Sequence, residues 1–105
     1  MAARALRDAG MSVIARNYRW RQGEIDIIAL DGETVVFAEV KTWSKLGIEN
    51  LGISLNERKR RKIIETAKYF LQEHRQYENK AIRFDVVFIA EGALTHLASA
   101  FMETV

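Results

Sequence analysis

The amino-acid sequence predicts an α/β fold in which helices flank one mixed β-sheet. The first observation is a hairpin: the apolar runs Glu24–Leu30 and Thr34–Lys41 are joined by Asp31-Gly32-Glu33, and Asp-Gly between such runs is the strongest short signal for antiparallel strands. The second is a long helix, because apolar residues recur at helical spacing between Ile63 and Leu71. The third is that strand-like runs lie on both sides of these elements. The expected order is one helix, three strands, the long helix and two strands.

Length and composition are those of one globular domain covering residues 1–105. The chain has no cysteine, which excludes a disulfide framework and a thiolate zinc site. No apolar run approaches the roughly 18 residues that cross a membrane, and the N-terminus lacks the apolar core of a secretory signal. We therefore expect a cytoplasmic protein without membrane contact.

The chain before the hairpin is expected to form a helix and a strand. Ala2–Ala9 is rich in good helix formers. Met11–Trp20 contains β-prone residues, although Asn17 interrupts the run. In the hairpin itself, strict alternation would place Ile25 and Ile27 on the same face. Both hairpin faces carry apolar residues, which predicts a central hairpin covered on two sides.

The chain after the hairpin is expected to contain a loop and the long helix. Trp43–Ile53 has two glycines and no periodicity, which is typical of a loop. A capping box from Ser54 to Glu57 begins the helix, and the helix is expected to end between His74 and Asn79. The last elements are expected to be a strand, a turn and a final short strand: Ala81–Ala90, Glu91-Gly92 and Ala93–Phe101.

Charged residues form blocks along the chain. Residues 1–22 carry five arginines and one acid, residues 23–39 five acids and no base, and residues 41–62 seven bases and two acids. An acidic centre between basic flanks suits a polyanion such as nucleic acid, with the carboxylates holding a cation. A solvated surface of mixed charge is the alternative. The bases assigned to backbone binding are Arg16, Arg19, Arg21, Arg58, Lys59, Arg60, Arg61 and Lys62.

Four charged residues lie in the predicted hairpin. Residues two apart in a strand share a face, so Glu24 and Asp26 should lie together, as should Glu39 and Lys41. Asp26 and Glu39 could ligate Mg²⁺ or Mn²⁺, with water and a substrate phosphate as the other ligands. Lys41 would then orient the attacking water or stabilise the transition state, and Glu24 would be a further ligand or the partner of Lys41. A cross-strand ion-pair cluster on a solvated sheet face is the alternative.

The residues around this centre resemble a known nuclease motif. Gly23-Glu-Ile-Asp26, a hairpin and then Glu39-Val-Lys41 are similar to the PD-(D/E)xK motif of the restriction-endonuclease-like nucleases. One branch, the bacterial YraN-like family, is related in fold to archaeal Holliday junction resolvases, and the resemblance to it runs from Ala2 to Phe101. The strings that carry it are Asn17-Tyr-Arg19, Gly23-Glu-Ile-Asp-Ile-Ile-Ala29, Val36-Phe-Ala-Glu-Val-Lys-Thr42 and Arg83-Phe-Asp-Val-Val87.

The resemblance implies a restriction-endonuclease-like fold and a magnesium-dependent phosphodiesterase that acts on DNA, with branched or flapped DNA as candidate substrates. It assigns metal ligation to Asp26 and Glu39, makes Lys41 the catalytic lysine and makes Glu24 an accessory acid. Junction-type nucleases of this fold often work as homodimers, so a homodimer is a candidate assembly. A nucleic-acid-binding or partner-binding module that no longer cleaves is the alternative, because fold does not decide function.

This chain departs from the YraN-like pattern at two places. Family members usually carry an acidic residue in the first helix, upstream of the point that matches Ala2, so we expect one accessory ligand to be missing here. Trp43 stands where the family usually has arginine. This exchange replaces a phosphate contact by a stacking surface for a nucleobase.

Overall fold

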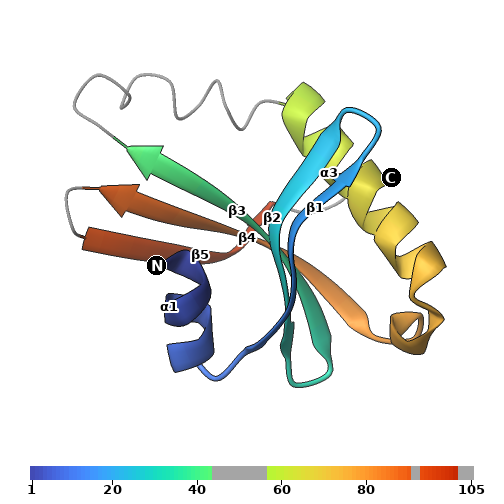
Figure 1. Cartoon of the computed structure of the whole chain (residues 1–105), viewed down its shortest axis with the longest axis horizontal. Coiled ribbons are helices and arrows are strands. Elements are labelled where there is room, and N and C mark those ends of the chain that lie inside the picture. Colours follow the sequence, from blue (N-terminus) through green and yellow to red (C-terminus); the bar gives the residue numbers. More distant parts are fainter. Residues whose placement is uncertain (44–56, 91–92, 102–105) are drawn as a thin grey trace.

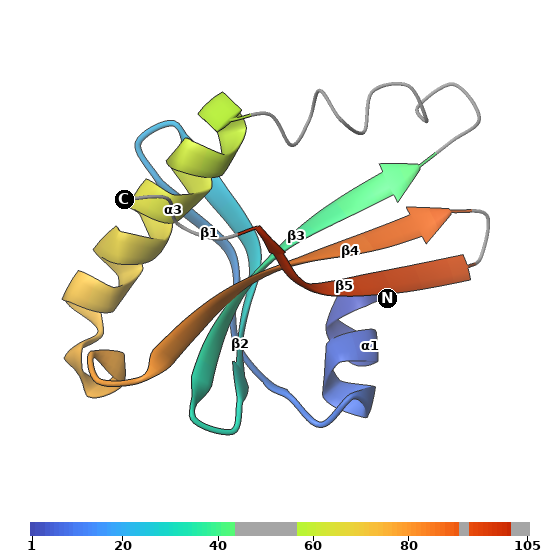
Figure 2. The same cartoon turned by 180° about the vertical axis from the view of Figure 1, so that it is seen from behind.

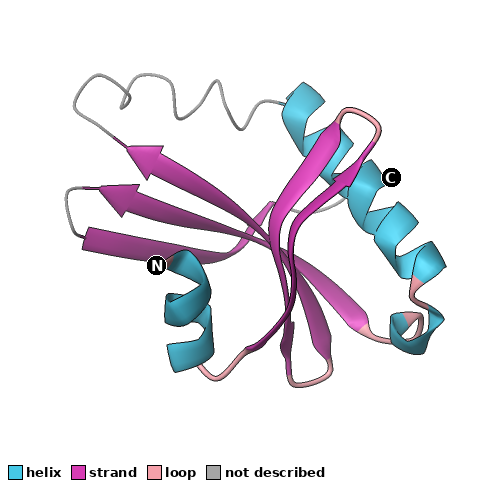
Figure 3. Ribbon diagram, in the orientation of Figure 1, coloured by secondary structure: helices cyan, strands magenta, loops and turns pink. Residues whose placement is uncertain are grey.

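The computed structural model describes residues 1–43, 57–90 and 93–101. Five strands form one sheet in the order β1-β2-β3-β4-β5, in which β3 and β4 are parallel and the other neighbours are antiparallel (Figure 1). The elements are α1 (Ala2–Asp8), β1 (Ser12–Trp20), β2 (Gly23–Asp31), β3 (Thr34–Trp43), α3 (Glu57–Glu73), the 3-10 helix η2 (Arg75–Tyr77), β4 (Ala81–Ala90) and β5 (Ala93–Phe101). Helices flank the mixed sheet (Figure 3), as in a restriction-endonuclease-like domain, and the predicted fold class is confirmed.

Helices α1 and α3 cover opposite faces of the sheet (Figures 1 and 2). On β3, alternate residues point to each side: Val35 and Phe37 pack under α3, whereas Val36 and Ala38 pack with α1. All four are at most 1% exposed. Burial of apolar side chains on both faces confirms that the hairpin is central, and this burial is the main stabilising contribution to the sheet.

The sheet divides between β2 and β3. Their pairing runs from Asp31–Thr34 to Ile27–Ala38 and stops there. Beyond this point β2 stays paired with β1, and β3 stays paired with β4, so the two pairs of strands diverge (Figure 1). We call this opening the fork; Asp26 on β2 and Glu39 on β3 are the first residues inside it.

The tip of the β1–β2 hairpin is held against α3 at Gly23. Gly23 is buried, and a Cβ atom there would overlap Thr66 Oγ1 and lie 2.9 Å from the backbone oxygen of Lys62. Thr66 Oγ1 donates a hydrogen bond of 2.7 Å to the same backbone oxygen of Lys62. Only glycine allows this close approach of strand and helix, so the distance between the tip of the β1–β2 hairpin and α3 depends on it.

The faces of β2 and the end of the long helix differ from the sequence-based expectation. Ile25 packs with Ile28 under α3, while Ile27 packs with α1, so the prediction that Ile25 and Ile27 share a face was wrong. The alternation changes where β2 leaves β3, and there Asn17 on the paired strand adopts a left-handed φ of 52°. The long helix ends at Glu73, just before the expected range, and η2 follows.

The other predicted elements agree with the structure where the chain is described. Trp43 continues β3 instead of beginning the loop, because it is still paired with Ala90 of β4. The rest of the predicted Trp43–Ile53 loop, the Ser54 cap and the Glu91-Gly92 turn fall outside the described residues. Within the described ranges, no helix is long and apolar enough to cross a membrane.

Candidate functional site at the fork of the sheet

Asp26 lies where β2 leaves β3. Its Oδ2 accepts a hydrogen bond of 2.7 Å from the backbone N–H of Val40, so the carboxylate bridges the two diverging strands. This N–H would otherwise lack a partner, because the β2–β3 ladder has already ended. The bond occupies one carboxylate oxygen and leaves Oδ1 for a second interaction.

Glu39 lies across the fork from Asp26, on the α3 side of β3. It is 8% exposed, and its Oε1 is 3.2 Å from Lys41 Nζ and 3.6 Å from Lys59 Nζ. Burial raises the pKa of Glu39, and the nearby Asp26 carboxylate raises it further. The two lysines oppose this rise without cancelling it. Glu39 is therefore a carboxylate whose ionisation is costly and which an added cation would stabilise.

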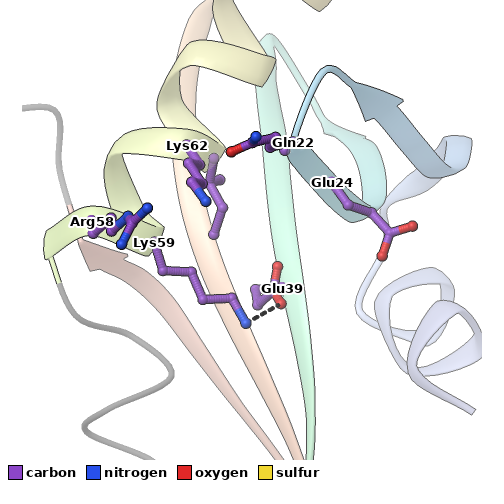
Figure 4. Close-up of a pocket in the computed structure, with 8 residues that line it drawn as sticks. Gln22, Glu24, Glu39, Arg58, Lys59 and Lys62 are labelled. Carbon is purple, nitrogen blue, oxygen red and sulfur yellow. Dashed lines mark ion pairs between the residues drawn. The ribbon is translucent and has the colours of Figure 1, made fainter.

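Glu39 opens into a pocket of about 490 Å³ between β3, the β1–β2 turn and the first turns of α3. Figure 4 shows Lys59 reaching from the helix to Glu39, with Arg58 and Lys62 on the same wall and Gln22 opposite. Because Glu39 is buried in a hollow, the alternative of a flat, solvated ion-pair surface does not describe it.

The carboxylate of Glu24 does not lie with those of Asp26 and Glu39 as the sequence predicted. It lines the pocket, but its carboxylate points away from Glu39 (Figure 4) and pairs with the exposed Arg19. Glu24 had two expected roles, a further metal ligand or the partner of Lys41. The structure pairs Lys41 with Glu39 instead, and the role of Glu24 as a further ligand stays a prediction. Glu24 lies on the part of β2 that is no longer paired with β3, and there it faces Arg19, its cross-strand neighbour on β1.

The family described as "Uncharacterised protein family UPF0102" matches residues 1–89 of the chain. The chain belongs to this family. A UPF0102 protein of Treponema pallidum is 40% identical over 111 residues, covering 99% of this chain and 88% of the relative. One of Persephonella marina is 39% identical over 100 residues, covering 95% and 85%, and one of Nocardia farcinica is 45% identical over 89 residues, covering 85% and 69%. The predicted YraN-like membership is thus confirmed at the level of the UPF0102 family.

The structure divides the predicted nucleic-acid contacts of this UPF0102 chain into groups. Arg58, Lys59 and Lys62 line the pocket at Glu39. Arg60 and Arg61 are exposed, and Arg61 pairs with Glu57 one helical turn earlier at 3.2 Å. The helix thus presents only part of its basic run to the fork.

The predicted nucleic-acid contacts on and near β1 also lie in different surroundings from one another. Arg16 lines a different hollow, next to α1, together with Asp26. Arg19 is paired with Glu24, and Arg21 lies over the ring of Trp20. The predicted stacking role of the Trp43 side chain lies outside the described part of the chain.

Lys59 was assigned only to backbone binding, and its contact with Glu39 was not foreseen. Burial lowers the pKa of Lys59, the neighbouring Lys41 lowers it further, and Glu39 opposes the shift. In the sequence, Lys59 is one of five consecutive bases, so nothing local distinguishes it. Only the docking of α3 on the sheet selects this position.

The fork fits a small divalent cation by the chemistry of its donors. In the described residues, no three His, Cys, Asp or Glu side chains gather at one point. Mg²⁺, however, is usually held by one or two protein carboxylates, with water and substrate phosphate completing its coordination. Asp26 and Glu39, one from each side of the fork, supply such a pair.

Proposed function

We propose that this UPF0102 chain is a metal-dependent nuclease that hydrolyses phosphodiester bonds in DNA, branched or flapped DNA included. The observation that carries the proposal is that Asp26 and Glu39 lie on the two sides of the fork of a mixed sheet, with Lys41 against Glu39 and a pocket with a basic wall beside it. The same three residues carry the resemblance to the PD-(D/E)xK nucleases, a relation that supports the proposal.

Each residue of the fork has a role in the proposed reaction. Asp26 and Glu39 would hold Mg²⁺ or Mn²⁺ through their carboxylates. Such an ion, when bound, lowers the pKa of water and neutralises charge that develops on the phosphoryl group. Lys41 lies beside Glu39, where its ammonium can donate a hydrogen bond to the attacking water or to a phosphoryl oxygen.

The basic wall of the pocket would hold the DNA backbone. Arg58 and Lys62 lie on the α3 side of the pocket that Glu39 lines (Figure 4). Cations near a helix N-terminus oppose the helix dipole, so a phosphate bound there would relieve an unfavourable interaction. Binding through these side chains would weaken as salt concentration rises.

The test is a cleavage assay on linear duplex, single-stranded, flapped and four-way-junction DNA with Mg²⁺ or Mn²⁺. We expect the unmodified chain to cleave at least one substrate and Lys41→Ala to be slower by about 10²-fold or more. Lys80→Ala is the matched control, because Lys80 forms an ion pair of 2.7 Å with the exposed Glu33, away from the fork. Absence of cleavage of every substrate by a protein that binds DNA would overturn the proposal, and activity that survives in Lys41→Ala would indicate a contaminating nuclease.

Metal binding gives a readout that does not depend on activity. Calorimetric titration of the unmodified chain with Mn²⁺ should show binding that Asp26→Asn and Glu39→Gln each weaken. Glu73→Gln, on the exposed C-terminal end of α3, is the matched carboxylate control. Equal Mn²⁺ binding in all four proteins would exclude the fork as the metal site.

A non-cleaving module that binds nucleic acid or a protein partner is the second candidate, and one observation favours it. Glu39 lies beside two ammonium groups, those of Lys41 and Lys59, so this carboxylate has cationic partners without a metal. A nucleic-acid-binding module and a nuclease both predict salt-sensitive DNA binding. Only the nuclease predicts cleavage that requires both the metal and Lys41.

A further inference from the structure

A second hollow lies beside the pocket at Glu39. Its volume is about 320 Å³, within the range of small-molecule sites. Gln22, Gly23 and Lys62 line both hollows. The two are therefore neighbours around the point where the β1–β2 turn meets α3.

An aromatic side chain forms one wall of this second hollow. The half-buried Trp20 stacks on Tyr69 of α3, with ring centroids 4.7 Å apart and planes 12° from parallel. The guanidinium carbon of Arg21 lies 4.6 Å from the centroid of the Trp20 ring. The indole thus already has one ring stacked on it and a cation over it, so a nucleobase would stack on the Arg21 guanidinium, which lines the hollow, rather than on the indole itself.

The charges of the hollow favour a nucleic acid as its occupant. Arg21 and Lys62 contribute positive charge to the wall, and Glu65 contributes the one carboxylate among the lining residues. Lys62 stands between the two hollows, where it can contact a phosphate that joins a nucleotide in one to a nucleotide in the other. A strand could thus pass from Glu39 to Trp20 with its backbone beside Lys62.

We propose that the Trp20 hollow is a subsite for an unpaired nucleobase next to the phosphate that lies at Glu39. The inference rests on the proposed function, since it places the base relative to that site. A base inside a duplex is stacked on both sides, so it must leave the stack to reach the Arg21 guanidinium that lies over the half-buried indole. The preferred substrates are then single strands or strands with unpaired nucleotides beside the cleavage point.

Tryptophan emission tests the subsite directly. Trp20 and Trp43 are the two tryptophans, so Trp43→Phe leaves Trp20 as the single reporter. The protein is titrated with an oligothymidylate and with a blunt duplex, both in EDTA so that nothing is cleaved. We expect the single strand to quench Trp20, and the blunt duplex to bind without comparable quenching.

A charge-matched pair of variants separates stacking from general attraction. Arg21→Ala removes the guanidinium from Trp20 and should weaken binding of the single strand by about tenfold, which lies within the range for one stacked base. Arg75→Ala removes the same charge from η2, where Arg75 is paired with Glu78 at 2.9 Å. Arg75→Ala should leave single-strand affinity nearly unchanged.

Several outcomes would overturn the subsite: no binding of the oligothymidylate, binding without quenching of Trp20, equal quenching by the blunt duplex, or equal losses in Arg21→Ala and Arg75→Ala. The nuclease proposal is judged separately by cleavage with Mg²⁺. Cleavage by a protein whose Trp20 is not quenched would overturn the subsite alone. Quenching by a protein that does not cleave would overturn the nuclease alone and leave a single-strand-binding module.

Discussion

Asp85 and Glu39 are buried carboxylates on the neighbouring parallel strands β4 and β3, yet their surroundings differ. Asp85 is fully buried and receives hydrogen bonds of 2.8 and 2.9 Å from Arg83, 2.6 Å from His96 Nε2 and 3.0 Å from the backbone N–H of Ser99. Glu39 has ammonium groups at 3.2 and 3.6 Å and opens into a pocket. The first carboxylate is enclosed by donors, and the second is accessible.

The pKa values shift in opposite directions as a result. Burial alone would raise the pKa of Asp85, but the hydrogen bonds from Arg83, His96 and Ser99 outweigh it, so the pKa is lowered. For Glu39, burial and the Asp26 carboxylate outweigh the lysines, so the pKa is raised. A carboxylate with a full set of donors is typical of a structural role, whereas one that is short of positive charge is typical of a binding or catalytic site.

The largest expected effect is the loss of the structural carboxylate. Asp85→Ala leaves Arg83 without its main partner, and we expect the free energy of unfolding to fall by about 3 kcal/mol, at the low end for a broken buried pair because Arg83 is partly exposed. Asp31→Asn is the control, since Asp31 also binds Arg83, at 3.0 Å, but is more exposed. Urea denaturation measures both. A loss from Glu39→Gln as large as that from Asp85→Ala would break the distinction between the two carboxylates.

The close contact between Gly23 and α3 gives the next largest effect on stability. Gly23→Ala drives a methyl group into Thr66, and overpacking of this kind costs about 1–3 kcal/mol. Thr66→Ala in the same chain removes the clashing oxygen and should restore part of the stability, although the Lys62 backbone oxygen at 2.9 Å remains. A double-mutant cycle by urea denaturation measures the coupling. Simple additivity would show that the hairpin and α3 are not in contact at Gly23.

The pH dependence of stability should have opposite signs at the two carboxylates. The folded pKa of Asp85 lies below its ordinary value of 3.8, so its contribution is present above that pH and is lost as the pH falls through the folded pKa. The folded pKa of Glu39 lies above its ordinary value of 4.5, so stability is lost as the pH rises from there through the folded pKa.

Denaturation at a series of pH values, compared with two variants, separates these contributions. The stability difference between the unmodified chain and Asp85→Asn should shrink as the pH falls below about 4. As the pH rises above about 4.5, the free energy of unfolding of the unmodified chain should fall relative to that of Glu39→Gln. If the two stability differences changed with pH in the same direction, the assignment of the two pKa shifts would be contradicted.

Most of the fold could be predicted because its signals are local. Asp31-Gly32 marked the hairpin, and Gly32 has the left-handed φ, 59°, that such a turn needs. The apolar stripe of α3 was likewise visible in the sequence, and its residues Ile63, Ala67 and Phe70 are buried as the helical spacing requires. The fork could not be predicted, because strict alternation assumes strands that stay paired. The separation of β2 from β3 beyond the Ile27–Ala38 pair goes with the contact of Gly23 with α3, an element distant in sequence.

The candidate site was predictable to the same extent. Asp26, Glu39 and Lys41 come together through the hairpin and a spacing of two residues, both of which are readable in the sequence. The direction of Glu24 was not readable, because it depends on the fork. Arg83 and Asp85 are two residues apart on one strand, a spacing that places them on the same face, and the structure joins them in an ion pair.

The smallest expected effect concerns the two lysines at Glu39. Lys41→Met and Lys59→Met each remove a cation, so each should raise the pKa of Glu39 further, and Lys41→Met should raise it more because Lys41 is closer and less exposed. Each change in the free energy of unfolding should be within about 1 kcal/mol, because the pairs are partly solvated. NMR titration of the Glu39 carboxyl carbon measures the pKa. Lys62→Met is the control, because Lys62 lines the same pocket but is not among the described charges that shift Glu39. An equal rise in Lys62→Met would mean that Glu39 responds to the general basicity of α3, and the contrast with the specifically bonded Asp85 would no longer hold.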